Sequence, residues 1–275
     1  IVSNGENTSC CLGSCKLPKS FSWRNRHGEN WNSPVKNQGS VPSCTQFGPM
    51  SSIEAVINLF YNTHLDIDLS EQITASCGNT IYQTAKIKED GTHDYITAPA
   101  GECYNVNSPG SIICKAKTIG IPDEKCYPYV GYLNSSTYVC DNLCGNYKDR
   151  VWKVADFEQL LPSDNMIADW SPMSKRVHQE LISEEKLKKT IISYGPVANE
   201  KLIEGHAVSI IGWIDKIGRV EWLYKDNYGE SYGENGYGAY PGDASKFIVG
   251  YIKTPIIPPP NTDYQIKCVD KDNDN

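Results

Sequence analysis

The sequence has no long apolar run and no excess of basic residues. No stretch approaches the roughly 18 consecutive apolar residues that a membrane-spanning helix needs. The net charge of −7 argues against general nucleic-acid binding, which calls for a basic surface. No internal repeat is apparent, and Ile1 opens neither a signal peptide nor a recognisable pro-segment, so we expect a mature or trimmed form.

The composition is that of a folded globular protein. Hydrophobic residues make up 39% of the 275 residues and charged residues 21%. A chain of this length can bury one sizeable core or two lobes packed together. Helical periodicity dominates the first half, and from His206 onward the apolar runs become those of β-strands. We therefore expect an α+β fold, with a helical half followed by a β-rich half.

The 11 cysteines are an odd number, which fits one free thiol and ten paired cysteines. Such density implies an oxidising compartment, or a cell type that keeps intracellular disulfides, and we expect an extracellular or cell-surface location. Zinc is the alternative, because the Cys10-Cys11-x3-Cys15 cluster and the Cys140-x3-Cys144 pair could supply ligands. Neither has a nearby histidine or a common zinc spacing, so disulfides are favoured.

The stretch from Lys36 to Cys44 carries the strongest chemical signal. It places the amide of Gln38 six residues ahead of Cys44, across a bend that contains glycine and proline. Apolar residues at steps of three and four follow Cys44, which predicts a buried helix that ends near Asn62-Thr63. The positive end of a helix dipole favours a thiolate. A buried structural cysteine or half of a disulfide is the alternative for Cys44.

A thiolate nucleophile needs a base, and the sequence offers five histidines. Four of them lie in polar or loop-like contexts, where a solvated surface histidine is expected. His206 differs because it opens a strongly apolar strand directly after Gly205, where its ring would be held rigidly. Taken alone, His206 could equally be a histidine buried for structural reasons.

The sequence resembles the papain-like cysteine peptidases, as a divergent member. Six motifs carry the resemblance, in the order in which the family has them, over about residues 17 to 252. They are Leu17-Pro18 with Phe21-x-Trp23-Arg24; Val35-Lys36-Asn37-Gln38-Gly39-Ser40 up to Ser43-Cys44; Leu69-Ser70-Glu71-Gln72 up to Cys77; Tyr127-Pro128-Tyr129; His206-Ala207-Val208; and Lys225-Asp226-x-Tyr228-Gly229 through Gly233-Glu234-Asn235-Gly236-Tyr237-Gly238.

The resemblance implies a two-lobed fold, with the nucleophile helix in a helical left lobe, a β-barrel-like right lobe and an active-site cleft between them. It implies a peptidase domain over residues 17–252, with the left lobe at about 17–140 and the right lobe at about 141–252. Residues 1–16 would be a Cys-rich extension, and residues 253–275 a Pro-rich linker and acidic tail. By position, Cys44 is the nucleophile, His206 its base and Gln38 the side-chain donor of the oxyanion hole.

The chain departs from the family at several places. Asp226 stands where the family has the asparagine that orients the histidine, which predicts a Cys-His-Asp triad. The side chains of Asp226 and Asn227 should not both point at His206, because successive side chains along a strand point to opposite faces of the sheet. Thr45 replaces the aromatic residue that follows the nucleophile in the family, and Val41 replaces a cysteine. Tyr228 and Tyr232 replace tryptophans, although Tyr228 could still shield the histidine–aspartate contact. The Gly-Gly pair that lines the cleft in the family is not visible.

Two further expectations concern the cysteines and the chain length. Cys77 with Cys140 is the disulfide that the resemblance supports best, and the remaining eight cysteines allow 105 pairings. The stretch from Ala198 to Gly205 is shorter than the family usually has, either through a deletion or through omitted residues.

The C-terminal tail carries Asp270, Asp272 and Asp274 at alternate positions, as at the start of a calcium-binding loop. The glycine and closing glutamate of such a loop are absent, so a solvated acidic tail is the alternative. We expect no cofactor for catalysis, with structural calcium at this tail as the one metal that the sequence suggests.

These observations predict a cysteine endopeptidase that acts on a peptide or protein substrate through a thioester, as a monomer. A second hypothesis is acyl transfer of the transglutaminase or cell-wall amidase type, which also uses Cys-His-Asp sets. A third is a catalytically weakened adhesion or binding module, which the altered aromatic and Gly-Gly positions suggest.

Overall fold

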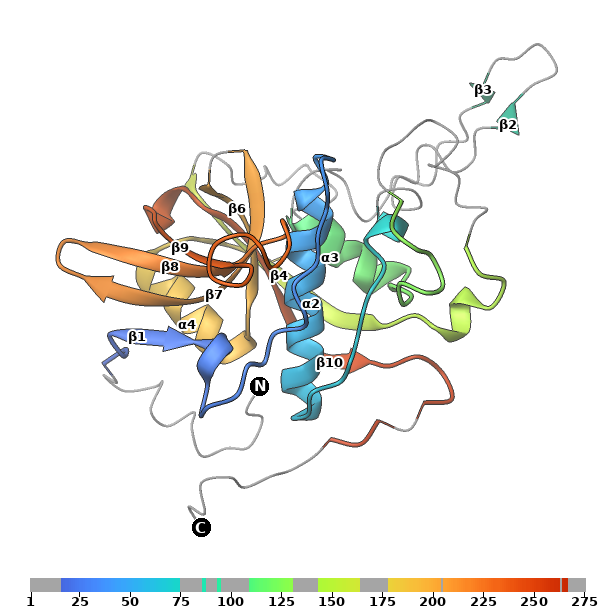
Figure 1. Ribbon diagram of the computed structural model, residues 1–275, viewed down its shortest axis with the longest axis horizontal. Coiled ribbons are helices and arrows are strands. Elements are labelled where there is room, and N and C mark those ends of the chain that lie inside the picture. The colour runs from blue at the N-terminus through green and yellow to red at the C-terminus, as the bar shows by residue number, and fades with distance from the viewer. Residues whose placement is uncertain are drawn as a thin grey trace.

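The computed structural model describes residues 16–74, 86–87, 93–94, 109–130, 143–163, 178–203, 205–262 and 264–266. Figure 1 shows a group of helices beside a large twisted sheet. The helices are α2 (Cys44–Tyr61), α3 (Pro109–Thr118) and α4 (Glu184–Tyr194). The strands are β1 (Ser20–Ser22), β2 (Lys86–Ile87), β3 (His93–Asp94), β4 (Lys153–Leu161), β5 (His178–Leu181), β6 (Val197–Ile203), β7 (His206–Lys216), β8 (Arg219–Lys225), β9 (Tyr237–Pro241) and β10 (Ile248–Ile257).

The large sheet has the strand order β5-β4-β10-β6-β7-β8-β9, and β1 pairs with β7. Strands β6 to β9 are antiparallel neighbours, so the β-strands predicted from His206 onward are confirmed. The sheet begins earlier than predicted, because β4, β5 and β6 precede His206. Strands β6 and β7 pair antiparallel, with Ile203 opposite His206, and His206 is the first residue of β7. Most of the short stretch from Ala198 to Gly205 belongs to β6, and the cause of its shortness stays open.

Helix α2 has the bounds that the sequence predicts. It begins at Cys44 and ends at Tyr61, where Asn62 takes the left-handed conformation of a helix cap. The helix runs unbroken through Pro49, and both Gly48 and Pro49 are buried. Among the described residues, no helix is both long and apolar enough to cross a membrane.

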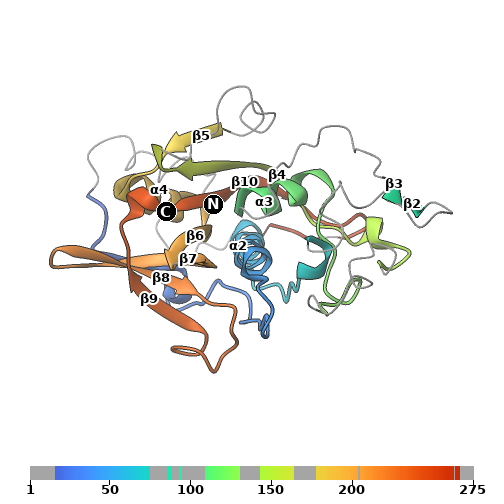
Figure 2. The same ribbon diagram turned by 90° about the horizontal axis from the view of Figure 1, so that it is seen from above.

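Two clusters of buried hydrophobic residues form the interior. One joins α2 and α3 to the start of β4 and includes Ile53, Ile57 and Ile112. The other fills the β-rich half beneath α4 and includes Trp213 and Trp222. Figure 2 shows α2 end-on, with α3 on one side and β6 and β7 on the other. We call these halves the helical lobe (α2, α3 and residues 63–74 and 119–152 as far as described) and the β-rich lobe (the large sheet and α4).

Strands β1 and β10 come from the two ends of the described chain. Strand β1 pairs with β7 in the β-rich lobe. Strand β10 extends to Ile257 and pairs with β4 as far as Lys153, so regular pairing continues five residues beyond the linker start that the resemblance implies. Ile256 is buried in the cluster of the helical lobe, so β10 ties one lobe to the other.

Candidate active site

Cys44 lies at the front of α2, and a close backbone approach brings it next to β7. The Cα of Gly48, one turn into the helix, faces the backbone of Val208, and a Cβ built there would lie 3.2 Å from Val208 C and N. Only glycine allows this approach without displacing one of the elements. The start of the helix that carries Cys44 therefore rests on the start of the strand that carries His206.

The thiol of Cys44 and the imidazole of His206 lie within hydrogen-bonding reach of each other. Burial raises the pKa of the thiol, but the hydrogen bond and the charge of His206, with backbone N–H groups of Ala207 and Thr45, lower the pKa overall. Burial likewise lowers the pKa of His206, but Asp226 and Cys44 raise it to about 9. These opposite shifts favour a thiolate–imidazolium pair.

Asp226 follows the end of β8 and points at the histidine. Its Oδ1 lies 3.3 Å from Nε2 of His206 and accepts the backbone N–H groups of Asn227 at 2.7 Å and Tyr228 at 3.1 Å. The side chain of Asn227 turns away and donates to the carbonyl of Ala207 at 3.1 Å. The two neighbouring side chains thus face different groups, and the aspartate is the one that meets His206.

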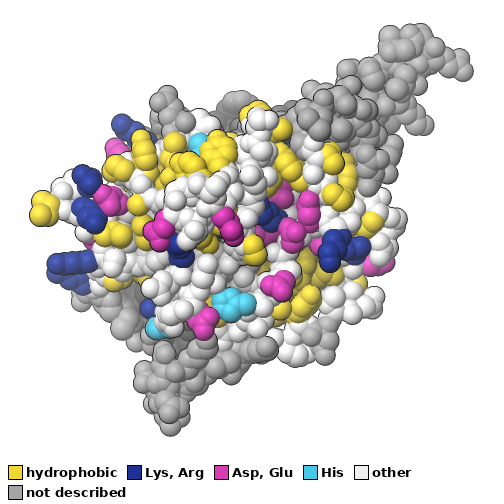
Figure 3. Space-filling model, viewed as in Figure 1, with side chains coloured by type: hydrophobic (Ala, Val, Ile, Leu, Met, Phe, Trp, Pro, Cys, Tyr) yellow, Lys and Arg dark blue, Asp and Glu magenta, His cyan; other side chains and the backbone are white. Residues whose placement is uncertain are grey.

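Tyr228 covers the open face of the imidazole. The two rings are stacked, with centroids 4.8 Å apart and planes 6° from parallel. The face of the tyrosine ring carries negative potential, which stabilises a cationic imidazole. Tyr228, Tyr232 and Tyr240 are among the large hydrophobic residues that are exposed to solvent. Figure 3 shows hydrophobic side chains gathered at the upper edge of the molecule, over the β-rich lobe.

Gln38 is held beside this group by a short bridge between the lobes. Its backbone N–H donates to the carbonyl of Asn227 at 2.8 Å, and the N–H of Gly229 donates to the carbonyl of Lys36 at 3.1 Å. Asn37 and Tyr228 are the paired residues of this isolated antiparallel β-bridge, which lies between the two hydrogen bonds. The side-chain Nε2 of Gln38 donates to the carbonyl of Val41 at 2.6 Å. The segments that carry Gln38 and Asp226 are therefore direct neighbours.

The hydroxyl groups of Tyr129 and Ser43 lie beside this site, and the sequence predicted no role for them. Tyr129 Oη lies 2.6 Å from Oγ of Ser43 and donates to the carbonyl of Gln38 at 3.2 Å. Tyr129 belongs to the Tyr-Pro-Tyr motif, and Ser43 precedes the nucleophile. The motif was a visible signal, but the contact joins residues 86 and 91 positions apart, which no local pattern reveals.

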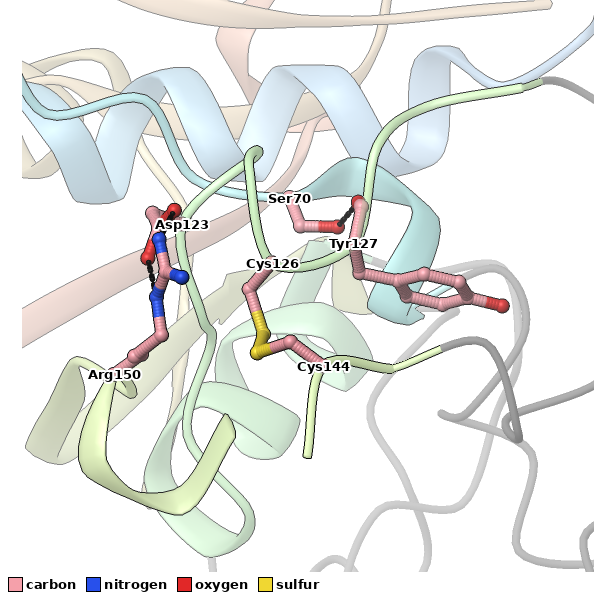
Figure 4. The surroundings of a disulfide bond; sticks show 6 residues. All are labelled: Ser70, Asp123, Cys126, Tyr127, Cys144 and Arg150. Atoms are coloured by element: carbon pink, nitrogen blue, oxygen red, sulfur yellow. Dashed lines mark hydrogen bonds and ion pairs between the residues drawn. A yellow bond between two sulfur atoms is a disulfide. The ribbon is translucent and has the colours of Figure 1, made fainter. Parts of the chain in front are cut away.

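The described disulfide joins Cys126 to Cys144, next to the Tyr-Pro-Tyr segment. Figure 4 shows it beside the bond from Ser70 Oγ to the carbonyl of Tyr127, which is 2.5 Å long. This pair is one of those that the sequence left open. The expected Cys77–Cys140 bridge lies outside the described residues. Among the described cysteines, Cys44 is free.

No group of metal-ligating side chains occurs in the part of the chain that the structure describes. The expected calcium ligands Asp270, Asp272 and Asp274 lie outside that part, so the calcium expectation stays a prediction.

A buried charge cluster lies behind the site and joins the lobes. Lys36 Nζ lies 2.8 Å from Glu54 and 2.9 Å from Glu71, and both carboxylates are almost fully buried. Burial opposes the charge of Lys36, but these acids outweigh it and raise its pKa. From the β-rich lobe, Lys225 Nζ donates to Ser33 Oγ at 2.8 Å, and Ser33 donates to Glu54 at 2.5 Å.

Comparisons with known proteins identify the family of this chain. The family model described as papain family cysteine protease matches residues 17–246. The thiol protease aleurain-like of Arabidopsis thaliana is 26% identical over 80% of this chain and 55% of its own length. Pro-cathepsin H of Mus musculus is 25% identical over 82% of this chain and 60% of its own length. The chain therefore spans less than two thirds of these relatives.

Solved structures agree in fold. A structure from work on the mite allergens Blo t 1 and Der p 1 superposes with a TM-score of 0.58 at 20% identity, over 92% of this chain and 73% of that one. The crystal structure of the Carica candamarcensis cysteine protease CMS1MS2 in complex with E-64 gives a TM-score of 0.53 at 18% identity, over 86% of this chain and 99% of that one. The expected two-lobed fold is confirmed, and the chain belongs to the papain family of cysteine proteases.

Proposed function

We propose that this chain is an endopeptidase that cleaves peptide bonds with Cys44 as nucleophile, His206 as base and Asp226 as the group that orients His206. The observation that carries the proposal is the pair of opposite pKa shifts at Cys44 and His206, at the junction of α2 and β7. A sulfur nucleophile in this state needs no further activation.

The reaction follows from the positions of these groups. The Cys44 thiolate attacks the peptide carbonyl and forms a tetrahedral adduct, and His206 then donates its proton to the leaving amine as the C–N bond breaks. A water molecule gives a proton to His206 and attacks the resulting thioester, which releases the carboxylic acid and restores the Cys44 thiolate beside the His206 imidazolium. The charge of Asp226 stabilises the imidazolium in both halves of the cycle.

We assign the oxyanion hole to the Nε2 group of Gln38 and the backbone N–H of Cys44. Nε2 carries two protons, and the bond to the Val41 carbonyl uses one of them. The second can donate to the negative oxygen of the tetrahedral adduct. Support comes from the fixed backbone of Gln38, because a donor that is held in place costs no reorganisation during the reaction.

The disulfide and the relatives support an oxidising compartment, and we infer an extracellular or cell-surface protein that acts on peptide or protein substrates as a monomer. Disulfides such as Cys126–Cys144 persist where thiols are not kept reduced.

The test is covalent labelling combined with a peptidase assay. An epoxide of the E-64 type or iodoacetamide should label Cys44 alone among the described cysteines and abolish cleavage of a denatured protein. Cys44→Ala should remove both labelling and cleavage. Peptidase activity that survives Cys44→Ala would disprove the proposal, and amine incorporation without net hydrolysis would favour acyl transfer instead.

A further inference from the structure

The hydroxyl of Tyr129 lies between the two residues that would supply the oxyanion hole. It donates to the backbone carbonyl of Gln38 at 3.2 Å and lies 2.6 Å from Oγ of Ser43, the residue directly before Cys44. Between Gln38 and Ser43 the chain forms a bend that belongs to no helix or strand. The ends of this bend are therefore joined by a side chain from elsewhere in the helical lobe.

We propose that Tyr129 is a positioning residue of the oxyanion hole, whose hydroxyl fixes the Gln38 amide relative to the backbone N–H of Cys44. This inference rests on the proposed function, since it concerns the same site. A loose bend would let the two donors drift apart, and a displacement of about 1 Å at a catalytic group can cost on the order of 10²-fold in rate.

The hydrogen bond between Tyr129 and Ser43 also takes the place of the usual capping bond of Ser43 at the N-terminus of α2. Ser43 is the N-cap residue of α2, where a serine side chain ordinarily accepts a backbone N–H from the first turn. Here its side chain makes no capping bond and meets Tyr129 instead. The serine hydroxyl thus does not compete for the N–H groups at the front of α2, where the thiolate and the oxyanion need donors.

Tyr129 is anchored independently of the bend that it holds. Its ring meets Phe47 edge-on, at 4.9 Å between centroids and 90° between planes. Its backbone N–H donates to Glu124 at 2.6 Å, and the next N–H along, that of Val130, donates to Gln72 at 2.9 Å. Just upstream, the Cys126–Cys144 disulfide and the bond from Ser70 to Tyr127 hold the same segment (Figure 4).

Gln38 is consequently held from both lobes. Its backbone N–H is bound by Asn227 of the β-rich lobe, and its carbonyl by Tyr129 of the helical lobe. The two peptide units that flank the Cα of Gln38 are therefore each held by a hydrogen bond, which fixes the direction in which its side chain leaves the backbone. The tyrosine hydroxyl therefore completes a clamp that the sequence neighbours of Gln38 do not provide.

The test removes single hydroxyl groups. Tyr129→Phe should lower kcat about tenfold with KM unchanged, a smaller loss than the roughly 10²-fold cost of removing an oxyanion donor in Gln38→Ala. Inhibition by a peptide aldehyde, whose adduct places an oxygen in the hole, should weaken by a similar factor. Tyr240→Phe, which removes a hydroxyl from an exposed tyrosine on β9, is the matched control and should leave kcat unchanged.

A double-mutant cycle separates positioning from general stability. If the hydroxyl acts through Gln38, Tyr129→Phe combined with Gln38→Ala should be no slower than Gln38→Ala alone. Ser43→Ala removes the other end of the tether and should reproduce the loss in kcat, which provides a second test if Tyr129→Phe folds poorly.

Full kcat in Tyr129→Phe, or kcat losses that multiply with that of Gln38→Ala, would overturn the inference and leave the proposed function standing. Peptidase activity that survives Cys44→Ala would overturn both.

Discussion

Nε2 of His206 lies 3.3 Å from Oδ1 of Asp226, a carboxylate whose side chain is fully buried. Two backbone N–H groups donate to the same oxygen, while Oδ2 has no hydrogen-bond partner among the described residues. The aspartate is thus fixed through one oxygen, and its negative charge acts directly on the imidazole. This relationship sets the pH range in which the Cys44–His206 ion pair exists.

Asp226→Asn should move the alkaline limb of the pH profile of kcat/KM to lower pH. The pKa of His206 is raised to about 9, so the imidazolium persists up to that pH and is lost above it. An amide accepts the same hydrogen bond without a negative charge, so the pKa of His206 should fall and activity should decline earlier as the pH rises. The profile of kcat/KM reports these groups in the free enzyme.

Asp215→Asn is the control for this change, because it removes a carboxylate from the far end of β7 that pairs with Lys188. An alkaline limb that stays in place in Asp226→Asn would contradict the role of Asp226.

Gly48→Ala should separate the nucleophile from its base. Alanine favours a helix over glycine by about 1 kcal/mol, but the added methyl group would lie 3.2 Å from the backbone of Val208, which sheet pairing holds in place. We expect α2 to shift away from β7, kcat/KM to fall and the thiolate at neutral pH to become scarcer. The rate of iodoacetamide alkylation against pH measures the thiolate directly.

The matched substitution is Gly145→Ala, since a Cβ at that exposed glycine meets no atom within 4 Å. An unchanged alkylation profile in Gly48→Ala would show that the close approach does not set the thiolate population.

Lys36→Met should destabilise the fold strongly. It leaves Glu54 and Glu71 buried without the cation that lies within 3 Å of both, and breaking a buried pair in this way costs about 3–5 kcal/mol. Urea unfolding at neutral pH measures the loss. Lys189→Met, which breaks an exposed pair with Glu185, is the control and should leave the urea midpoint almost unchanged.

The loss of stability in Lys36→Met should also depend on pH. Burial already raises the pKa of Glu71 to about 8 although Lys36 opposes the shift. Without Lys36 the folded state binds protons more readily than the unfolded chain, so its stability should rise as pH falls. The deficit against the unmodified protein should therefore shrink toward pH 5, and a constant deficit would count against the buried-charge explanation.

Replacing Cys126 and Cys144 together by serine should lower the free energy of unfolding by about 3 kcal/mol, as expected for a loop of roughly 15 to 20 residues. Because the disulfide also holds the segment of Tyr129, kcat should fall by a few-fold at temperatures where the variant is still folded. Denaturant unfolding and initial rates measure the two effects. A loss of stability with full kcat would confine the disulfide to a structural role.

The sequence by itself determined the order of the elements and the main chemical groups. The spacing of apolar residues after Cys44 predicted both the existence of α2 and its C-terminal end. These features depend on neighbours within one or two turns, so a local pattern records them. The family motifs added the pairing of Cys44 with His206.

Only the tertiary structure decided how these groups meet. The choice of Asp226 over Asn227, the hydrogen bond from Gln38 to Asn227 and the hydroxyl contacts of Tyr129 join residues that lie far apart in the sequence, such as Tyr129 and Gln38 at a separation of 91. Such contacts depend on the close approach of Gly48 to β7 and on the packing of the two lobes, which leave no periodic trace in the sequence. The sequence predicts Cys44 and His206 as the reacting pair, and the packing of the two lobes sets the distance between them and the charges around them.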